Sequence, residues 1–358
     1  MNVMSSELSN KFRNVGFVCA LLVVAIHVGK TDIACSAAWW MYEIMGGGLS
    51  ACAVPFFFLA SGYFAAKDFD EKGYWGTALA KRVKSLLVPF VLWSVVFFVE
   101  IVFLRGMQNL MHGEPFGWRW AFTSNALFEL SGLNPFVMPT SFPLWFVRSL
   151  FVIFLILPMF EYLSRTWLRF LLGLAFGVAC MIAVGGMQGN WNGLFRFTVS
   201  VEGAVYFLAG AFLRRHNLPR PLPRCVLVLC GAGAIAAVMS CAFFAASGVV
   251  VPKLVQIILI PFEMLGLWGI VPASVWPAWL TGSSFAVFLI HVPLLSVLNV
   301  LVVWIGRWMG TDITLYALTS ACEWVLACAL SVGVAHLLFR LCPHMSAVLF
   351  GGRLPGKR

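Results

Sequence analysis

The residues of this chain best suited to chemistry are ionisable side chains placed inside long apolar stretches. His27 lies near the end of one such stretch, residues 12–28. Four further residues of this kind follow along the chain: Arg148, Glu202, Glu263 and His291. An ionisable side chain at membrane depth costs on the order of 3 kcal/mol or more, so it faces a bundle interior or a wet cavity. Where several such residues converge, they indicate a functional site.

His27 is suited to general-base chemistry, because an imidazole exchanges protons near neutral pH. A neighbouring carboxylate, from Glu202 or Glu263, would fix its tautomer and stabilise the imidazolium. Arg13 precedes His27 by fourteen residues, so on a helix the two lie on nearly the same face, roughly 21 Å apart. The alternative for His27 is a packing residue that hydrogen-bonds a neighbouring helix.

Each of the other intramembrane residues also has two interpretations. Either glutamate is a substrate-site residue or a structural hydrogen-bond partner between helices. His291 precedes Val292 and Pro293, which makes a kink-stabilising role an alternative to catalysis. Arg148 either holds an anion or marks the start of its helix.

Composition identifies the class of protein. The chain has 358 residues, of which 61% are hydrophobic and 11% charged, with a mean hydropathy of +0.92. Soluble domains contain about a quarter charged residues, so this is a multi-pass membrane protein. The net charge of +10 does not indicate nucleic acid, because the cations cluster in short loops between apolar stretches. The ten cysteines are scattered without metal-ligand spacing, so we expect no metal site.

Ten apolar stretches have the length of a membrane-spanning helix, about 17 to 25 residues. They cover residues 12–28, 49–66, 83–104, 143–160, 168–184, 195–213, 225–246, 254–271, a stretch from about 283, and 316–339. We therefore predict an all-α bundle of about ten helices. The first is expected to be a retained helix, since no small-residue cleavage site follows it. There is no internal repeat, which disfavours repeat-built transporter folds.

The distribution of cations predicts the orientation. With the N-terminus inside, seventeen Lys and Arg residues fall in inner segments and five in outer ones, as the positive-inside rule requires. Both termini are then cytoplasmic, His27 lies toward the outer face, and residues 105–142 form an external loop. We predict one transmembrane domain, 1–345, followed by a short basic cytoplasmic tail, 346–358.

The inner cations have a second possible role. Arg82, Lys84 and Arg214 belong to inner clusters that are able to bind the phosphates of a cytosolic donor. Topology and anionic lipid headgroups explain the same clusters equally well. No GxSxG, HExxH, P-loop or dinucleotide-binding motif is present, so hydrolase and nucleotide-cradle mechanisms of soluble enzymes lose support.

Six blocks in order resemble the membrane-bound acyltransferase-3 family. They are the first helix with His27, VPFFFLASGYF at 54–64, KRVKSLLVPFVLW at 81–93, PLWFVRSLFV at 143–152, YFLAGAFLRR at 206–215 and SFAVFLIHVP at 284–293. The resemblance implies a ten-helix core in a bacterial cytoplasmic membrane. It also implies acyl transfer from cytosolic acyl-CoA to a hydroxyl at or beyond the outer face.

The resemblance also assigns individual residues. The family's catalytic histidine corresponds to His27, its FFxSGY segment to residues 57–63 and its LWF motif to residues 144–146. The family usually has an arginine eleven residues before the histidine, where this chain has Gly16. Arg13 lies one turn earlier on a similar face, and whether it takes over that role stays open.

The sequence therefore predicts an O-acyltransferase, in particular an O-acetyltransferase, that modifies a surface glycan or related hydroxylated acceptor. His27 is its expected general base, and acyl-CoA is its donor, with no permanently bound cofactor. The expected substrate-binding residues are Arg13, Ser61, Tyr63, Arg82, Lys84, Trp145, Arg148, Glu202, Glu263 and His291. Expected partners are membrane lipids and glycan-assembly proteins, without nucleic acid. The competing class is a secondary transporter or a flippase of lipid-linked glycans, and a structural or receptor role is third.

Overall fold

The computed structural model describes most of the chain. The described residues are 6–28, 43–123, 134–136, 139, 143–186, 190–218, 223–247, 253–309 and 314–353. Within these ranges the chain forms helices and turns and has no β-strand, so the predicted all-α class is confirmed.

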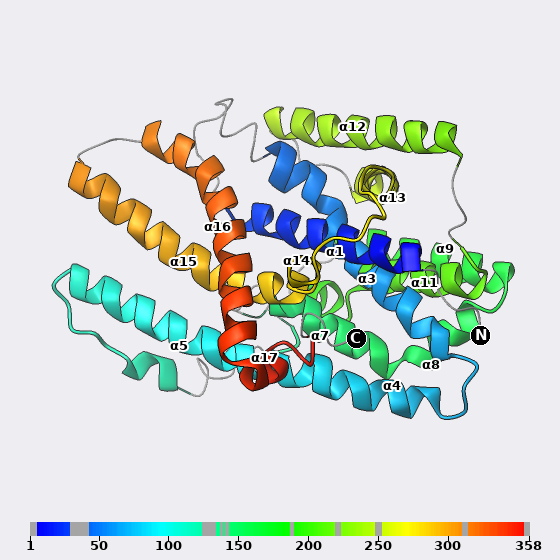
Figure 1. Ribbon diagram of the computed structural model, residues 1–358, viewed down its shortest axis with the longest axis horizontal. Helices are drawn as coiled ribbons and strands as arrows, with labels where there is room; N and C mark the ends of the chain where they lie inside the picture. The colour runs from blue at the N-terminus through cyan, green and yellow to red at the C-terminus, as the bar shows by residue number, and fades with distance from the viewer. Residues whose placement is uncertain are drawn as a thin grey trace.

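Fifteen α-helices are described (Figure 1). Their bounds are α1 (Ser6–His27), α3 (Ala53–Ala65), α4 (Tyr74–Arg82), α5 (Val88–Met111), α7 (Leu144–Leu155), α8 (Leu157–Leu163), α9 (Trp167–Gly186), α10 (Asn190–Gly193), α11 (Val201–Arg215), α12 (Arg224–Ala246), α13 (Lys253–Ile270), α14 (Ala278–Thr281), α15 (Ser284–Met309), α16 (Thr314–Leu341) and α17 (Pro343–Leu349). Shorter 3-10 and π-helical segments join them: η1 (Glu43–Gly48), η2 (Leu49–Cys52), η3 (Ala66–Asp68), η4 (Val83–Leu87), η5 (Arg119–Phe122) and η6 (Leu194–Thr198). Each of the ten predicted apolar stretches contains helical residues, but two of them are broken. Residues 143–160 form α7 and α8, and residues 195–213 form η6 and α11.

Seven helical runs among the described residues are long and apolar enough to cross a membrane. The bent pair α7 and α8 adds an eighth if it is one span, and α12 and α13 contain shorter apolar stretches. The pair was expected to be one helix over 143–160, but it bends by 68° at Ile156. Pro158 explains the break, since proline lacks the amide hydrogen that would continue the helix.

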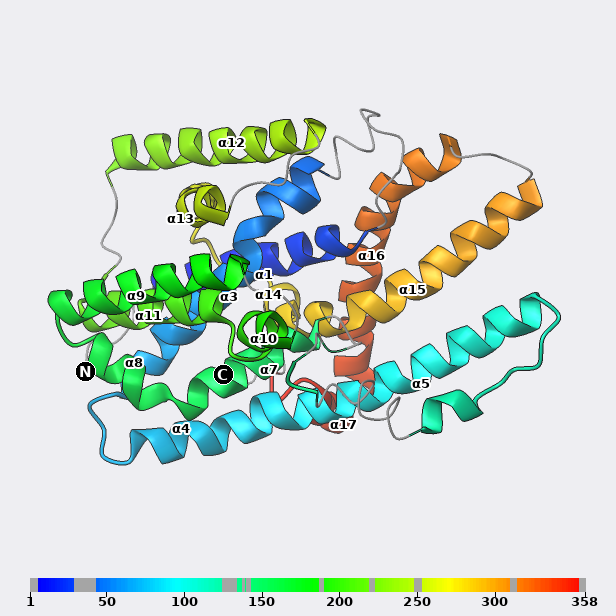
Figure 2. The same ribbon diagram turned by 180° about the vertical axis from the view of Figure 1, so that it is seen from behind.

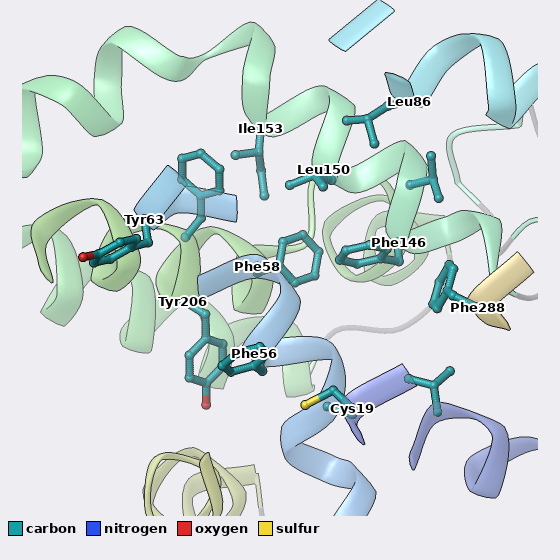
Figure 3. Packing of buried hydrophobic residues seen from close by; sticks show 14 of the residues in the cluster. Cys19, Phe56, Phe58, Tyr63, Leu86, Phe146, Leu150, Ile153, Tyr206 and Phe288 are labelled. Carbon is teal, nitrogen blue, oxygen red and sulfur yellow. The ribbon is translucent and has the colours of Figure 1, made fainter. Parts of the chain in front are cut away.

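The tightest helix contact joins α3 to α11. A Cβ on Gly62 would lie 2.0 Å from the Phe207 carbonyl oxygen, and one on Gly210 would lie 1.9 Å from the Leu59 oxygen. Only glycine permits this approach of two backbones, as in other membrane helix pairs with small residues at the contact. Around this contact, aromatic side chains of α3, α7 and α11 form the buried core (Figure 3).

The first helix occupies the centre of the bundle, next to α3, α15 and α16 (Figure 1). Its start is fixed by Lys11, which donates to the Val271 oxygen, and by Asn14, which donates to Pro272 at 2.9 Å and Ser274 at 2.8 Å. Trp324 of α16 donates to the Leu21 oxygen at 3.0 Å. These contacts set the position of the end of α1, where His27 lies.

The segment after α16 packs against the bundle. Phe350 is fully buried, Trp93 donates to the Leu349 oxygen at 3.1 Å, and Arg353 donates to the Ser85 oxygen at 2.9 Å. The domain boundary predicted after residue 345 therefore falls inside α17, and the described part of the predicted tail is joined to η4 and α5.

Segments that the charge pattern assigns to the inner face meet at one end of the bundle. Arg215 forms ion pairs with Asp70 at 3.2 Å and with Glu161 at 3.6 Å, and Arg165 pairs with Glu161 at 2.6 Å. Figure 2 shows α9 and α11, which lead to this network, side by side. The grouping agrees with the predicted topology, while the side of the membrane on which it lies stays a prediction.

Candidate functional site

Two histidines from distant parts of the sequence meet inside the bundle. Nδ1 of His27 lies 3.2 Å from Nε2 of His291, and the ring centroids are 4.9 Å apart. His27 is the last residue of α1, while His291 is the eighth residue of α15 and is fully buried. We call these two residues the histidine pair. It lies two turns inside α15, so His27 is within the bundle and not at the tip of a protruding helix.

Backbone carbonyls determine which ring nitrogens carry hydrogen in the neutral pair. His291 Nδ1 lies 3.1 Å from the Val287 oxygen, which can only accept, so Nδ1 donates and Nε2 keeps a lone pair. His27 Nδ1 lies 2.8 Å from the Val23 oxygen as well as near that lone pair, so it also donates. The remaining nitrogen of His27, Nε2, then carries the lone pair that a general base needs.

The hydrogen bonds of His291 do not reach the carbonyl that Pro293 leaves without a donor in α15. Pro293 removes the hydrogen bond to the Leu289 carbonyl, four residues earlier. The His291 ring contacts Val287 instead. Its geometry thus connects it to His27 and gives no support to the kink-stabilising alternative.

The two predicted carboxylate partners of His27 lie in two other places. Glu263 is buried between α13 and the core, close to Cys52 and Tyr206. Glu202 lines a cavity described below. A second imidazole, not one of these carboxylates, therefore lies beside His27 Nδ1.

Aromatic residues of the two motif segments lie next to the histidine pair. Phe288 packs 6.2 Å from the His291 ring, and contacts Phe146 at 5.4 Å and Phe57 at 6.4 Å. Phe57 comes from the FFxSGY segment and Phe146 from the LWF motif. The segments 54–64 and 143–152 of the sequence thus meet around α15.

The other residues of the FFxSGY segment lie further toward the end where the ion-pair network is. Tyr63 is buried and packs against Phe12 in a tilted arrangement, with ring centroids 4.7 Å apart, and the Arg214 guanidinium lies 5.4 Å from its ring. Ser61 is half-buried on α3.

The inner cations that were predicted to bind the donor begin with Arg82, which lies over the Phe154 ring at 4.4 Å. We call Arg82, Lys84 and Arg214 the donor-side cations; Lys84 is exposed.

Arg13 does not occupy the position of the family arginine. Its side chain is exposed on α1, whereas a Cβ at Gly16 would point at Phe57 and Phe56, at 3.9 and 4.0 Å. Arg148 has a different place again: it donates to the Asn134 oxygen at 2.8 Å and so holds the 134–136 segment.

A half-open cavity of about 620 Å³ lies between α3, α7, α9, α11 and α13. Two of the predicted substrate-binding residues, Trp145 and Glu202, line it. Sequence reasoning missed its other polar lining residues: Asn192, Arg196, Ser200 and Gln256. The polar stretch from 185 to 193, between two predicted apolar stretches, is the sequence signal for part of this set. We call this space the α9–α11 cavity.

Comparison with known proteins identifies the family of this chain and a curated relative. Residues 17–340 match the family model Acyl_transf_3, described as an acyltransferase domain. The succinoglycan biosynthesis protein ExoH of Rhizobium meliloti (strain 1021) is 25% identical over 340 residues, which covers 89% of this chain and 84% of that protein. No solved structure matches the chain.

Proposed function

Because this chain belongs to the acyltransferase-3 family and is a membrane enzyme that transfers acyl groups, we propose that it O-acetylates a glycan. The donor is acyl-CoA, bound from the cytosolic side of a bacterial cytoplasmic membrane. The acceptor is a hydroxyl of a surface polysaccharide or its precursor. The name of the relative ExoH, a succinoglycan biosynthesis protein, supports a polysaccharide acceptor.

The observation that carries the mechanism is the contact between His27 and His291. In the proposed step, His27 Nε2 takes the proton of the acceptor hydroxyl while the hydroxyl oxygen attacks the thioester carbonyl carbon. The carbon–sulfur bond then breaks, and His27 returns the proton to the departing CoA sulfur. His291 is a positioning residue: together with the Val23 oxygen, its Nε2 accepts from His27 Nδ1 and so supports the tautomer with a lone pair on His27 Nε2.

The donor phosphates are assigned to the donor-side cations. Arg82 and Arg214 lie over aromatic rings of α7 and α3, which fixes their direction near the end of the bundle where the ion pairs gather. A guanidinium suits phosphate because its parallel donors match the oxygens. Arg13, exposed at the start of α1, is also available at the membrane surface for the donor.

The reaction is tested with membranes that contain the protein and with [14C]acetyl-CoA. We expect release of CoA together with label in a saccharide fraction. Neither signal should appear with membranes that lack the protein. If no label reaches the saccharide fraction and CoA release does not exceed the background, the proposed transfer is refuted. Transport of an unmodified glycan without acetylation would favour the flippase alternative.

A further inference from the structure

We propose that the α9–α11 cavity binds a neutral saccharide part of the acceptor, remote from the hydroxyl that reacts; this rests on the proposed function. The cavity volume of about 620 Å³ lies within the usual range of small-molecule sites, roughly 300 to 1,000 Å³. The cavity is large enough to hold sugar rings and is larger than a site for a single ion.

Aromatic rings form one part of the cavity wall. Trp145 packs against Phe58 at 6.4 Å and against Phe197 at 6.1 Å, and all three line the cavity. Large aromatic faces offer apolar contact to the C–H faces of a sugar ring, and the indole N–H adds a hydrogen-bond donor.

Polar side chains complete the lining. Asn192 and Gln256 carry amides that both donate and accept, and Glu202 carries a carboxylate able to accept two hydroxyl hydrogens. Among the lining residues this one carboxylate is accompanied by one guanidinium, that of Arg196, which is exposed. The balance of charge disfavours an anionic ligand, and the mixture of amides, acid and aromatic rings disfavours a lipid tail. It suits a neutral polyhydroxylated ligand.

The wall of the cavity is fixed by hydrogen bonds between segments. Ser149 of α7 donates to the Phe197 oxygen at 2.7 Å, and Thr198 donates to the Pro135 oxygen at 2.6 Å. Ser200, a buried lining residue, has a φ of 44°, a left-handed conformation that is unfavourable for a residue other than glycine. Such strained residues cluster at ligand sites, where the surrounding structure maintains them.

An aromatic series joins this cavity to the histidine pair. From Trp145 the ring contacts continue to Phe146 at 6.5 Å, to Phe288 at 5.4 Å and to His291 at 6.2 Å. A layer of aromatic rings therefore separates a saccharide in the cavity from His27. It would contribute binding energy that orients the acceptor, without itself reacting.

Saccharide binding is measured without acyl-CoA, so that the result does not depend on transfer. The purified protein in nanodiscs is mixed with a panel of neutral gluco- and galacto-oligosaccharides of two to four residues and studied by saturation-transfer-difference NMR. We expect saturation transfer to at least one oligosaccharide. The signal should fall at least about fivefold in Glu202→Gln and in Gln256→Leu, since each loses hydrogen bonds to the ligand. Glu114→Gln, an exposed residue outside the cavity lining, is the matched control and should bind normally.

The outcomes separate this proposal from the proposed reaction. Binding of no oligosaccharide, or undiminished binding by Glu202→Gln, overturns the cavity assignment even if acetyl transfer is observed. A tightly retained lipid that excludes the oligosaccharides, detected by native mass spectrometry, overturns it as well. Glu202-dependent binding by a protein that transfers no acetyl group would support the saccharide site and refute only the reaction.

Discussion

The role of His291 leads to a prediction that depends on a single atom. If this residue fixes His27 through its Nε2, a side chain that places an accepting oxygen at the same position should replace it. Glutamine does so, because its amide group occupies roughly the place of Nε2. Asparagine has an amide of the same type one methylene shorter, near the place of Nδ1. We therefore expect His291→Gln to retain most of the acetyl transfer and His291→Asn to lose most of it.

The magnitude follows from the contact that is lost. The hydrogen bond between the histidines has a length of 3.2 Å and lies in a buried place. A net hydrogen bond contributes about 0.5 to 1.5 kcal/mol, and 1.36 kcal/mol corresponds to tenfold in rate. We expect kcat to fall about tenfold in His291→Asn and less than about threefold in His291→Gln, with the KM for acetyl-CoA unchanged in both.

The assay is steady-state transfer of [14C]acetyl in nanodiscs, with thermal unfolding of each variant measured in parallel. His336→Gln is the control, since it makes the same substitution on another long helix, where the ring contacts Trp279. A purely structural role would lower the thermal stability and the amount of active protein without separating glutamine from asparagine. Equal kcat values for the two variants at equal stability would refute the reasoning.

Three further predictions concern topology, donor binding and packing. A cysteine at Gly113 should be labelled by an impermeant reagent from outside and one at Asp70 should not, and the opposite pattern would invert the assigned orientation. Replacing the donor-side cations by glutamine should raise the KM for acyl-CoA more than that for the acceptor, because phosphate contacts are lost; an unchanged donor KM with normal insertion would return them to a topological role. Gly62→Ala should destabilise the protein by about 1 to 3 kcal/mol, because the added methyl group overpacks against α11. Gly231→Ala is the control and should not destabilise it, because a Cβ there meets nothing within 4 Å. Equal thermal unfolding of the two variants would contradict the described contact.

The helices were largely predictable from the sequence because a membrane-spanning helix needs a long apolar stretch, and each such stretch of this chain contains a helix. The bend between α7 and α8 was not predicted, although Pro158 was visible. The apolar stretch continues through the bend, and a hydropathy pattern does not show a change in the direction of the helix axis. Composition was also a poor guide for the predicted tail, 346–358: its cations Arg353, Lys357 and Arg358 suggested a surface segment, although Phe350 is buried.

For the candidate site, the sequence showed which ionisable residues lie in apolar stretches, but not which residues they contact. His27 and His291 were both selected because they are ionisable inside apolar stretches. Their contact was not foreseen, since nothing in the spacing of residues 264 positions apart indicates how α1 and α15 cross. Glu202 was assigned to the surroundings of His27 for its charge, and it lines the α9–α11 cavity instead. The strained conformation of Ser200 also has no sequence signal, because serine is ordinary at a helix start.

The proposed mechanism depends most on His27 as general base, and His27→Gln tests this role directly. Glutamine retains much of the size and hydrogen-bonding capacity of histidine but takes no proton near neutral pH. General-base catalysis contributes about a hundredfold to ten-thousandfold. We predict a variant that is inserted, binds acyl-CoA, unfolds at a temperature close to that of the unsubstituted protein, and transfers acetyl at least about a hundredfold more slowly. Near-normal transfer by this variant would contradict the mechanism and leave His27 a packing residue.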